Sequence, residues 1–547
     1  MTASAPQAGR EAQAAFDYII IGAGSAGCVL ANRLSADPST RVCLLEAGPS
    51  DRSAKMRLLT RMPGGMVQLL RDARTNWAHV LSTNGPNGDR TIPCPRGRIV
   101  GGTSVVNGMV YSRGNPGDYD NWSRLGNRGW SYNDVLPFFR RHEDFADGAT
   151  DLHGAGGELR VEPLADPHPL TNAFLRAAQD AGFAKNDDFN GPTQDGFGLH
   201  HLTQLGGERL GSARAFLDPI RGRDNLTIVP DALTLRILVA EGRAKGVEVR
   251  IANETRIVHA HREVILCAGA INSPQVLMLS GIGDPEQLGA LGIKRTVPLR
   301  GVGRNFQDHP GIAVVNRERS GTSLALTPRG LPSLAATPIQ YALRRRGALA
   351  GSVINGGGFV RTRDGLDWPD IKIDFMPLAR PFGKVIPRIH GFNVFAWLLR
   401  PQSRGRLSLR SPDPADRPLI ESNFFTADDD LIAMAAGIRT IRHILSQRSF
   451  DAYRDAEIAP GADVTGETAL KDYIRGHAGT IYHPVGTCRM GPDDELDAVV
   501  DERLRVRGVA NLRVADVSIM PTIVSGNTNA PAMMIGERAA DFILNGS

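Results

Sequence analysis

The clearest hydrophobic pattern lies near the start of the chain. An apolar run over residues 18–21 meets a glycine-rich segment, which leads into an Ala/Leu-rich run that ends at Leu34. A short apolar run bounded by glycines predicts a buried strand, and the longer run predicts a helix. A second apolar run over residues 41–45 predicts another strand. Strand, glycine turn, helix and strand together indicate a βαβ unit of the dinucleotide-binding type.

Later segments alternate between the helical period and the strand period. The apolar spacing over residues 171–182 predicts an amphipathic helix. Residues 225–249 read as two strands around a turn at Glu241 and Gly242, which predicts a hairpin. The chain then becomes rich in proline loops and strand candidates, which predict an antiparallel sheet in a second domain. These candidates are residues 370–376, 392–399 and 405–410.

Two helix starts are predicted from capping residues. A buried strand over residues 263–267 enters a glycine turn, and we expect the next helix to use Ser273 as its N-cap with Pro274 in the first helical position. The last helix of the chain is expected to begin in the same way, with Asn529 as the cap and Pro531 near the first position. The fold class that follows is α/β (α+β overall). It has a Rossmann-like domain and a second domain built on an antiparallel sheet flanked by helices.

The glycine segment carries the first candidate chemistry. Gly22 makes the tight turn, Gly24 allows the backbone to approach a pyrophosphate, and Gly27 allows the helix to pack on the strand. Phosphates are expected at the helix N-terminus, where free N–H groups favour negative charge. Glu46 ends the second strand, 19 residues beyond Gly27, where a carboxylate accepts hydrogen bonds from a ribose 2′-hydroxyl. The alternative is a structural βαβ unit without a ligand.

Composition excludes several other classes. The chain has 547 residues, 41% of them hydrophobic and 22% charged, which is typical of a globular protein. Its net charge is 63 − 58 = +5, and the basic residues are scattered with no basic stripe and interleaved aromatics, so nucleic acid is not an expected partner. The cysteines show no CxxC spacing and predict buried thiols, with neither a disulfide framework nor a metal site. They are Cys28, Cys43, Cys94, Cys267 and Cys488.

The ends and the charge of the chain bear on its location. Residues 1–15 read as a flexible tail with no signal-peptide core, and no run of about 18 apolar residues predicts a membrane span. We expect a cytoplasmic protein, with a peripheral position on the inner face of the membrane as the alternative. The alternative rests on the net positive charge and on Arg344, Arg345 and Arg346 beside apolar residues. A solvated basic helix explains the same arginines.

Two further segments hold candidate site residues. Residues 97–111 are rich in glycine and small polar side chains and predict a surface that lies against a flat ligand, or else a tight connecting loop. His483 precedes a proline, which holds its backbone extended, and its ordinary pKa near 6.5 suits a general base. Asn527 lies just ahead of the last predicted helix, where the helix dipole favours an anion. The alternatives are that His483 is a structural histidine and that Asn527 and Asn529 serve only to form the turn and the cap before the last helix.

These motifs together resemble the glucose–methanol–choline (GMC) family of FAD oxidoreductases over essentially the whole chain. The glycine motif with residues 46–48, the segment 97–111 and the segment 269–283 carry the resemblance, together with His483-Pro484 and residues 525–531. The branch that it resembles most is that of choline dehydrogenase and long-chain alcohol dehydrogenase.

The resemblance implies roles for individual residues. His483 would be the catalytic base and Asn527 its partner at the substrate oxygen. Some family members tether FAD through a histidine at the position of Val106, so valine there implies noncovalent FAD. The further cofactor-binding residues predicted are Gly22, Gly24, Ser25, Ala26, Gly27, Glu46, Ala47, Trp77, Arg98, Val100, Gly102, Thr103, Asn107, Gly108, Met109, Val110, Thr234, Ala515, Asp516 and Thr528.

The resemblance also implies a division of the chain. The FAD-binding domain is expected from residues 16–165, 205–312 and 475–547, the last with the catalytic segment, and the substrate domain from residues 166–204 and 313–474. The expected activity is FAD-dependent oxidation of a primary alcohol to the aldehyde, with hydride transfer to flavin N5 and a quinone-like or other electron acceptor. The alternatives are an oxygen-using alcohol oxidase and a light-driven fatty-acid decarboxylase on the same scaffold. A third alternative is a protein that binds flavin but has no catalytic activity.

Overall fold

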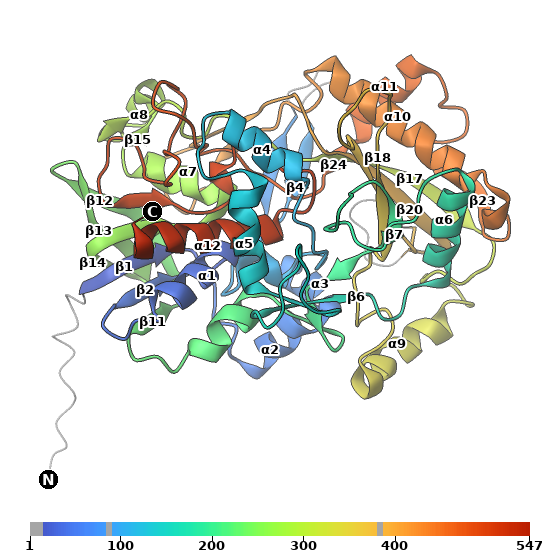
Figure 1. Cartoon of the computed structure of the whole chain (residues 1–547), viewed down its shortest axis with the longest axis horizontal. Helices are drawn as coiled ribbons and strands as arrows, with labels where there is room; N and C mark the ends of the chain where they lie inside the picture. Colours follow the sequence, from blue (N-terminus) through green and yellow to red (C-terminus); the bar gives the residue numbers. More distant parts are fainter. Residues whose placement is uncertain (1–14, 84–89, 380–386, 547) are drawn as a thin grey trace, which may run out of the picture.

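The computed structural model describes residues 15–83, 90–379 and 387–546. Two large sheets organise the molecule, and Figure 1 shows them at opposite ends of its long axis. The first sheet contains the N-terminal strand and the second lies among the helices α6, α10 and α11. The expected mixed α/β fold with a Rossmann-like part and an antiparallel part is confirmed.

The first sheet has seven strands in the order β11-β2-β1-β14-β13-β12, with β25 paired to β14. The strands β11, β2, β1, β14 and β25 run parallel, and β12, β13 and β14 form an antiparallel meander. Their bounds are β1 Ala15–Ile21, β2 Val42–Leu45, β11 Leu226–Val229, β12 Ala232–Ala240, β13 Arg243–Ile251, β14 Glu254–Leu266 and β25 Leu512–Val514. The hairpin predicted around Glu241 is the β12–β13 turn, where Glu241 has a φ of 53°.

Two helices from opposite ends of the chain pack together beside this sheet. They are α1 (Ser25–Leu34) and α12 (Asn529–Asn545). Gly536 allows the close approach, because a Cβ there would lie 2.8 Å from the carbonyl oxygen of Ala26. Arg33 forms an ion pair of 2.6 Å with the buried Glu537. The C-terminal segment is therefore fixed directly against the glycine turn.

The second sheet is antiparallel, in the order β23-β17-β20-β19-β18-β7, with β24 paired to β17. Its bounds are β7 Gly196–Leu199, β17 Pro310–Glu318, β18 Gly356–Val360, β19 Ile371–Met376, β20 Gly391–Leu398, β23 Arg454–Ala459 and β24 Gly479–Thr480. The helices α6 (Pro169–Asp180) and α10 (Asp428–Leu445) cover it, and Phe174, Phe375 and Ile438 belong to the shared core.

The strand predicted over residues 405–410 does not join this sheet. The observed strand β21 (Arg406–Ser408) pairs with β22 (Leu419–Glu421) in a separate four-stranded sheet with β3 (His79–Ser82) and β4 (Thr91–Cys94). The alternation of the side chains fixes the strand type but not the sheet that the strand joins, and here β22 connects β21 to two strands from the N-terminal part of the chain.

Both predicted N-caps were wrong: the first lies five residues after the observed N-cap Ala268, and the second lies one residue after the observed N-cap Thr528. Helix α7 (Gly269–Leu279) begins before Ser273, so Pro274 lies inside it. Pro274 has no N–H to donate to the carbonyl of Ala270, and the Thr487 hydroxyl donates to that carbonyl instead at 2.6 Å. A tertiary contact thus satisfies the carbonyl that an isolated helix would leave open.

At the last helix, the residue in the N-cap position is Thr528, and its side chain makes no cap. Asn529 is the first helical residue, and its Oδ1 accepts from the Ser25 hydroxyl at 2.7 Å. Pro531 therefore lies third in the helix, which is tolerated because the first N–H groups of a helix have no internal acceptor.

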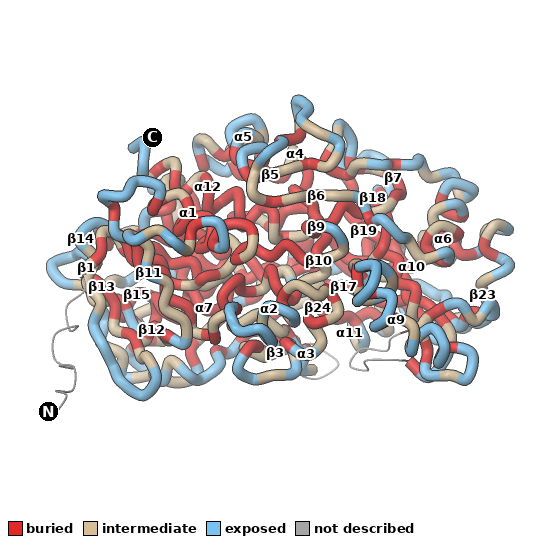
Figure 2. The backbone as a smooth tube through the Cα atoms, turned by 90° about the horizontal axis from the view of Figure 1, so that it is seen from below, coloured by how far each residue is buried: buried red, intermediate tan, exposed pale blue. Residues whose placement is uncertain are grey.

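The remaining elements are shorter or lie at the periphery. The helices among them are α2 Ala54–Arg61, α3 Met66–Arg71, α4 Pro116–Arg124, α5 Tyr132–His142, α8 Pro285–Ala290, α9 Leu331–Arg344 and α11 Glu467–His477, and the strands are β5 Glu143–Phe145, β6 Leu159–Pro163, β8 His201–Leu202, β9 Gln204–Leu205, β10 Glu208–Arg209, β15 Ile282–Gly283 and β16 Val297–Pro298. Figure 2 shows the buried residues concentrated along the centre of the molecule. The five cysteines are buried free thiols, as predicted.

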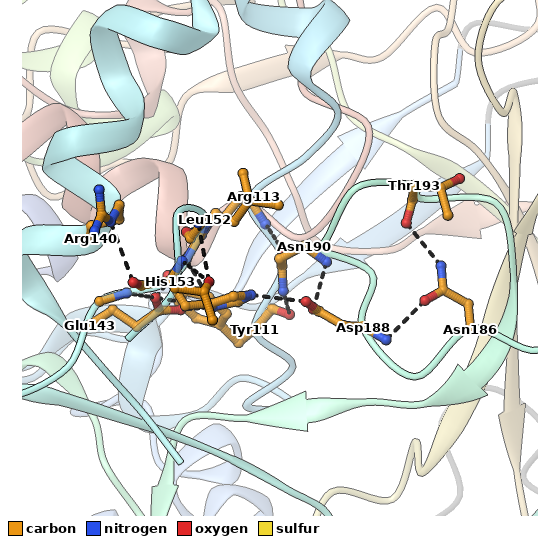
Figure 3. Close-up of polar contacts among 12 residues, drawn as sticks. Tyr111, Arg113, Arg140, Glu143, Leu152, His153, Asn186, Asp188, Asn190 and Thr193 are labelled. Carbon is orange, nitrogen blue, oxygen red and sulfur yellow. Dashed lines mark hydrogen bonds and ion pairs between the residues drawn. The ribbon is translucent and has the colours of Figure 1, made fainter. Parts of the chain in front are cut away.

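A buried ion-pair network stabilises the loops beside β5 (Figure 3). Arg113 pairs with Glu143 at 2.6 Å, and both side chains are almost fully buried. His153 lies between Glu143 and Asp188, at 3.1 Å and 2.9 Å, and stacks on Phe145. Removing one member of such a buried network leaves an unpaired charge, so the members depend on one another.

Candidate active site

A cavity of about 920 Å³ runs between the two large sheets. One end is lined by the glycine turn after β1 and by the start of α1. The other end is lined by β19, β20 and the segment after β24. Ligand sites in α/β sheets lie at the carboxyl ends of parallel strands, which is where the first end of this cavity is found.

The glycine end of the cavity is open to a ligand. Among the described residues, no atom apart from those of Gly24 and its neighbours in the chain lies within 4 Å of the position that a Cβ of Gly24 would occupy, so this glycine leaves space at the start of α1. Gly24 is the N-cap of α1 and has no side-chain cap, which leaves N–H groups of the first turn available to an anion. Gly22 has a φ of 104°, and a Cβ there would collide with Cys267. The tight turn at Gly22 and the open space at Gly24 are the geometry that the predicted roles require, and the approach of a pyrophosphate to Gly24 stays a prediction.

Glu46 lies at the end of β2 and lines the same part of the cavity. Its carboxylate accepts from the backbone N–H of Ala23 at 3.0 Å and from that of Gly48 at 2.9 Å. Burial raises the pKa of Glu46 to about 7, and the two backbone hydrogen bonds oppose that rise. The carboxylate is thus held in place by the turn and still faces the cavity.

Most of the predicted site residues line this one cavity. They are Gly22, Gly24, Ser25, Ala26, Glu46, Ala47, Trp77, Gly102, Thr103, Asn107, Gly108, Met109, Val110, Thr234, Asp516, Thr528, His483 and Asn527. Four others do not line it: Gly27, Arg98, Val100 and Ala515. Gly27 serves helix packing, because a Cβ there would lie 1.9 Å from the carbonyl oxygen of Gly22. Arg98 lies over the ring of the cavity residue Trp77 at 4.9 Å.

Thr234 supplies an unsatisfied polar group on the cavity wall. Its hydroxyl oxygen is buried and has no hydrogen-bond partner within the described part of the chain. Buried polar groups are normally paired, so an orphaned hydroxyl beside a cavity marks a place for a ligand atom. Val106 also lines the cavity and offers no nucleophilic atom.

His483 lies at the other end of the cavity and is half-buried. Its Nε2 is 3.3 Å from the amide nitrogen of Asn527, so the two predicted catalytic residues lie together. Its Nδ1 is 3.1 Å from Nδ1 of His309, and the two rings meet edge to face. The backbone N–H of His483 donates to Asp308 at 2.8 Å. Both the ring and the backbone of His483 are therefore fixed.

Sequence reasoning missed Asp308 and His309. His309 is fully buried and precedes Pro310, as His483 precedes Pro484. This second His-Pro pair was a signal that could have found it. Asp308 accepts from the backbone N–H groups of His309 and His483, and burial raises the pKa of its carboxyl to about 6.

Sequence reasoning also missed a charged pair on β19. Lys372 and Asp374 are 0% and 4% exposed, and their side chains lie 3.4 Å apart. Lys372 Nζ is 3.2 Å from Oδ1 of Asn527. Asp374 accepts from His200 at 2.8 Å and from the Trp397 indole at 3.0 Å. A buried charge next to the candidate catalytic pair is a functional signal, because burying a charge is otherwise costly.

Burial disfavours the charged forms of His483 and His309. Burial holds the pKa of His483 well below its usual range, and the neighbouring His309 and Lys372 lower it further. Burial likewise lowers the pKa of His309 to about 3, against the opposing effect of the Val524 and Leu399 carbonyls. A neutral imidazole facing a cavity can accept a proton, which is what a general base must do.

The fold and the cavity together define a mixed α/β protein with a Rossmann-like glycine turn at one end of the cavity and His483 beside Asn527 at the other. Family models described as GMC oxidoreductase match residues 16–311 and residues 401–536. The chain therefore belongs to the GMC oxidoreductase family, and the predicted resemblance is confirmed.

Individual relatives agree with this assignment. The chain is 42% identical to an alcohol dehydrogenase [acceptor] of Pseudomonas putida, over 97% of this chain and 96% of the relative. It is 40% identical to the mitochondrial choline dehydrogenase of Homo sapiens, over 98% and 91%. A formate oxidase of Aspergillus oryzae, solved in a study of FAD modification, superposes with a TM-score of 0.89 at 27% identity, over 97% of this chain and 98% of that one. The chain is thus an oxidoreductase of the class that acts on CH–OH donors, in a family of FAD-dependent enzymes.

Proposed function

We propose that this protein oxidises a primary alcohol to the aldehyde with FAD as the hydride acceptor. The observation that carries the proposal is one cavity that joins the glycine turn of β1 to a neutral His483 beside Asn527. The division of the chain into three FAD-binding and two substrate segments is part of the same proposal.

The residues at the glycine end fit FAD. The free N–H groups at the start of α1 suit its diphosphate, Glu46 suits the hydroxyls of its ribose, and the orphaned Thr234 hydroxyl lies where a further polar atom can pair. Val106 offers no atom for a covalent bond, which supports noncovalent binding. Gly102 and Asn107 line the continuation of the cavity toward His483.

In the proposed reaction, His483 takes the proton of the substrate hydroxyl at Nε2. FAD, when bound, supplies the acceptor for the hydride that leaves the substrate carbon. Asn527 lies beside the same nitrogen and stabilises the oxygen as it gains negative charge. A positioned general base of this kind contributes about 10²–10⁴ in rate.

We infer an uncharged alcohol and not choline as the substrate, on the ground that no unengaged carboxylate lines the described part of the catalytic end. Its wall contains Trp397, Phe395, Met376, Val353 and Ile354, which are apolar or aromatic. The carboxylates that line the described part of the cavity are engaged with protein partners: Glu46 with two backbone groups, Asp374 with three side chains, and Asp516 with residues 269, 273 and 518. A trimethylammonium group would therefore meet no unengaged carboxylate there.

For the electron acceptor we propose a quinone-like molecule reached from a membrane surface. Helix α9 exposes Leu331, Ile339 and Leu343, which are 55%, 60% and 79% accessible and follow one another at intervals of eight and four residues. Arg344 and Arg346 follow at its end and are exposed. Such a surface suits the interface of an anionic bilayer. The structure shows α9 projecting from the second sheet (Figure 1), and none of the described helices is long and apolar enough to cross a membrane.

The proposal is tested by anaerobic mixing of purified protein with a panel of alcohols in the dark. A primary aliphatic or benzylic alcohol should bleach the flavin absorbance, and choline should do so at least tenfold less efficiently. A decarboxylase or a flavin protein without turnover would leave the flavin oxidised with every alcohol. Reduction by choline at the same efficiency as by an uncharged alcohol would contradict the substrate class.

A further inference from the structure

The Lys372–Asp374 pair is placed by strand register. Lys372 lies between Phe359 on β18 and Trp397 on β20, its cross-strand neighbours. Its ammonium is 5.2 Å from the Phe359 ring and 4.8 Å from the Trp397 ring, so aromatic faces enclose it on both sides. Asp374 lies two residues along on the same face of the strand, as the period of a strand requires. The ammonium is therefore rigid and paired, and it points at Asn527.

Hydrogen-bond chemistry then orients Asn527. A lysine ammonium has three donors and no acceptor, so the amide atom that faces Lys372 at 3.2 Å must be the oxygen. The amide nitrogen consequently faces Nε2 of His483 at 3.3 Å as a donor. That nitrogen of His483 must then be the one without a proton.

The same logic continues to His309. A neutral His483 whose Nε2 is unprotonated carries its proton on Nδ1. That proton points at Nδ1 of His309, 3.1 Å away, which is the acceptor. His309 therefore carries its own proton on Nε2, a buried atom for which the described part of the chain provides no hydrogen-bond partner within normal geometry. Each assignment in the chain follows from the one before, and the chain begins at Lys372.

We propose that Lys372 is a positioning residue that fixes the Asn527 amide and thereby holds His483 in the tautomer whose Nε2 can accept the substrate proton. This inference rests on the proposed function and deepens it. The hydrogen bond between Asn527 and His483 is long and therefore weak, so a substrate hydroxyl can replace the amide as the donor to Nε2. Without the ammonium the amide can turn over, present its oxygen to Nε2, and favour the tautomer that cannot act as a base.

The positive charge of Lys372 also acts on the pKa of His483, and the negative charge of its partner Asp374 acts on that pKa in the opposite direction. The titratable and charged groups that act on His483 are His309, Lys372, Arg96 and Asp374, with Asp308 on its backbone. Lys372 lowers the pKa of His483, and Asp374 raises it. Removing the lysine should therefore move the low-pH limit of flavin reduction upward, and removing the aspartate should move it downward.

The first measurement does not depend on turnover. Protein labelled with 15N-histidine is studied by NMR, and the His483 signals are assigned as those lost in His483→Gln. In the wild-type holoenzyme we expect Nδ1 of His483 to carry the proton. In Lys372→Met we expect a mixture or the opposite tautomer. Ile373→Val, on the opposite face of β19 and in the apolar core, is the control and should leave the His483 signals unchanged.

The second measurement is the pH dependence of flavin reduction by an alcohol. Lys372→Met should reduce the rate at neutral pH about tenfold or more and raise the low-pH limit by about one unit. Lys372→Gln keeps a donor toward Asn527 without the charge, so it should keep the wild-type tautomer and still show the raised limit. This variant also covers the case in which methionine prevents folding.

The outcomes separate the two proposals. If Lys372→Met keeps the Nδ1–H tautomer, the positioning role is overturned whatever its low-pH limit. A wild-type limit in Lys372→Gln would overturn the electrostatic part. If the tautomer responds as expected but no alcohol reduces the wild-type flavin, the proposed function fails while the positioning role stands.

Discussion

Glu46 offers the sharpest test of how the cofactor is held. Its carboxylate has one oxygen on the Ala23 N–H and the other on the Gly48 N–H, and it is only 6% exposed. Replacing it with glutamine keeps the shape but turns one acceptor into a donor that faces a backbone donor. In the proposed complex the ribose hydroxyls also lose a charged acceptor. A hydrogen bond to a charged group contributes about 1.5–3 kcal/mol, so the Kd for FAD should rise about 10- to 150-fold in Glu46→Gln.

The change of the Kd for FAD with pH is an independent test of the role of Glu46. Burial raises the pKa of Glu46 to about 7, against the backbone hydrogen bonds. Below that pH the carboxylate is protonated, so the Kd for FAD should rise with falling pH, by up to about tenfold per unit. In the apoprotein the folded state keeps a proton that the unfolded chain releases above about 4.3. The free energy of unfolding of the apoprotein should therefore fall as pH rises between that value and 7.

The assay is fluorescence titration of deflavinated protein with FAD between about pH 5.5 and 8.5. Glu254→Gln is the matched control, because that carboxylate is 72% exposed on the β13–β14 turn, away from the cavity. The control should bind FAD as the wild type does, and Glu46→Gln should bind weakly with no pH dependence. An unchanged and pH-independent Kd in Glu46→Gln and wild type alike would refute the placement of the ribose at Glu46.

Four other outcomes are expected. His483→Ala should keep FAD but slow flavin reduction by about 10² or more, with partial recovery at high pH, as stopped-flow absorbance would show; a wild-type rate would remove His483 from the mechanism. Acid precipitation should release the flavin into the supernatant, because Val106 offers no tether; flavin retained in the pellet would contradict this. Glu143→Gln should lower the free energy of unfolding by about 3–5 kcal/mol, measured by denaturant titration, because it leaves Arg113 buried without its partner; a loss below about 1 kcal/mol would contradict the pairing. Reduced enzyme should be reoxidised faster by a soluble quinone than by air-saturated buffer, and oxygen that matched the turnover rate would identify an oxidase.

The same network that contains Arg113 carries a further pH dependence. Burial opposes charging of His153, yet its hydrogen bonds to Asp188 and Glu143 raise its pKa. The stabilisation from protonated His153 is complete below the unfolded pKa near 6.5 and is lost as pH rises through the higher folded pKa. This network joins residues 111–113 to the loop around Asp188. It therefore bears on stability beside the cavity wall at Met109 and Val110.

The part of the fold around the glycine turn, namely β1, α1 and β2, could be predicted because it depends on residues that are close together in the sequence. The roles of Gly22 and Gly24 follow from steric facts that hold in any fold, namely a tight turn and an open approach to a helix start. The apolar runs predicted β1, α1 and β2 to within a few residues for the same reason. Helix starts were less predictable, since the hydroxyl that compensates for Pro274 comes from Thr487, far away in the sequence.

The catalytic end was only half predictable, and β19 shows why. The run Ile371 to Met376 alternates apolar and charged residues, which in isolation predicts a half-exposed strand with Lys372 and Asp374 facing water. The structure buries both faces, one against the core with Phe375 and the other against the cavity end with His483. Nothing in the local pattern distinguishes water from a catalytic cavity, because both accept charged side chains. A catalytic cavity is distinguished from water by the residues that contact Lys372, namely Asp374, Trp397 and Asn527. Trp397 and Asn527 come from segments that meet β19 only in the folded chain.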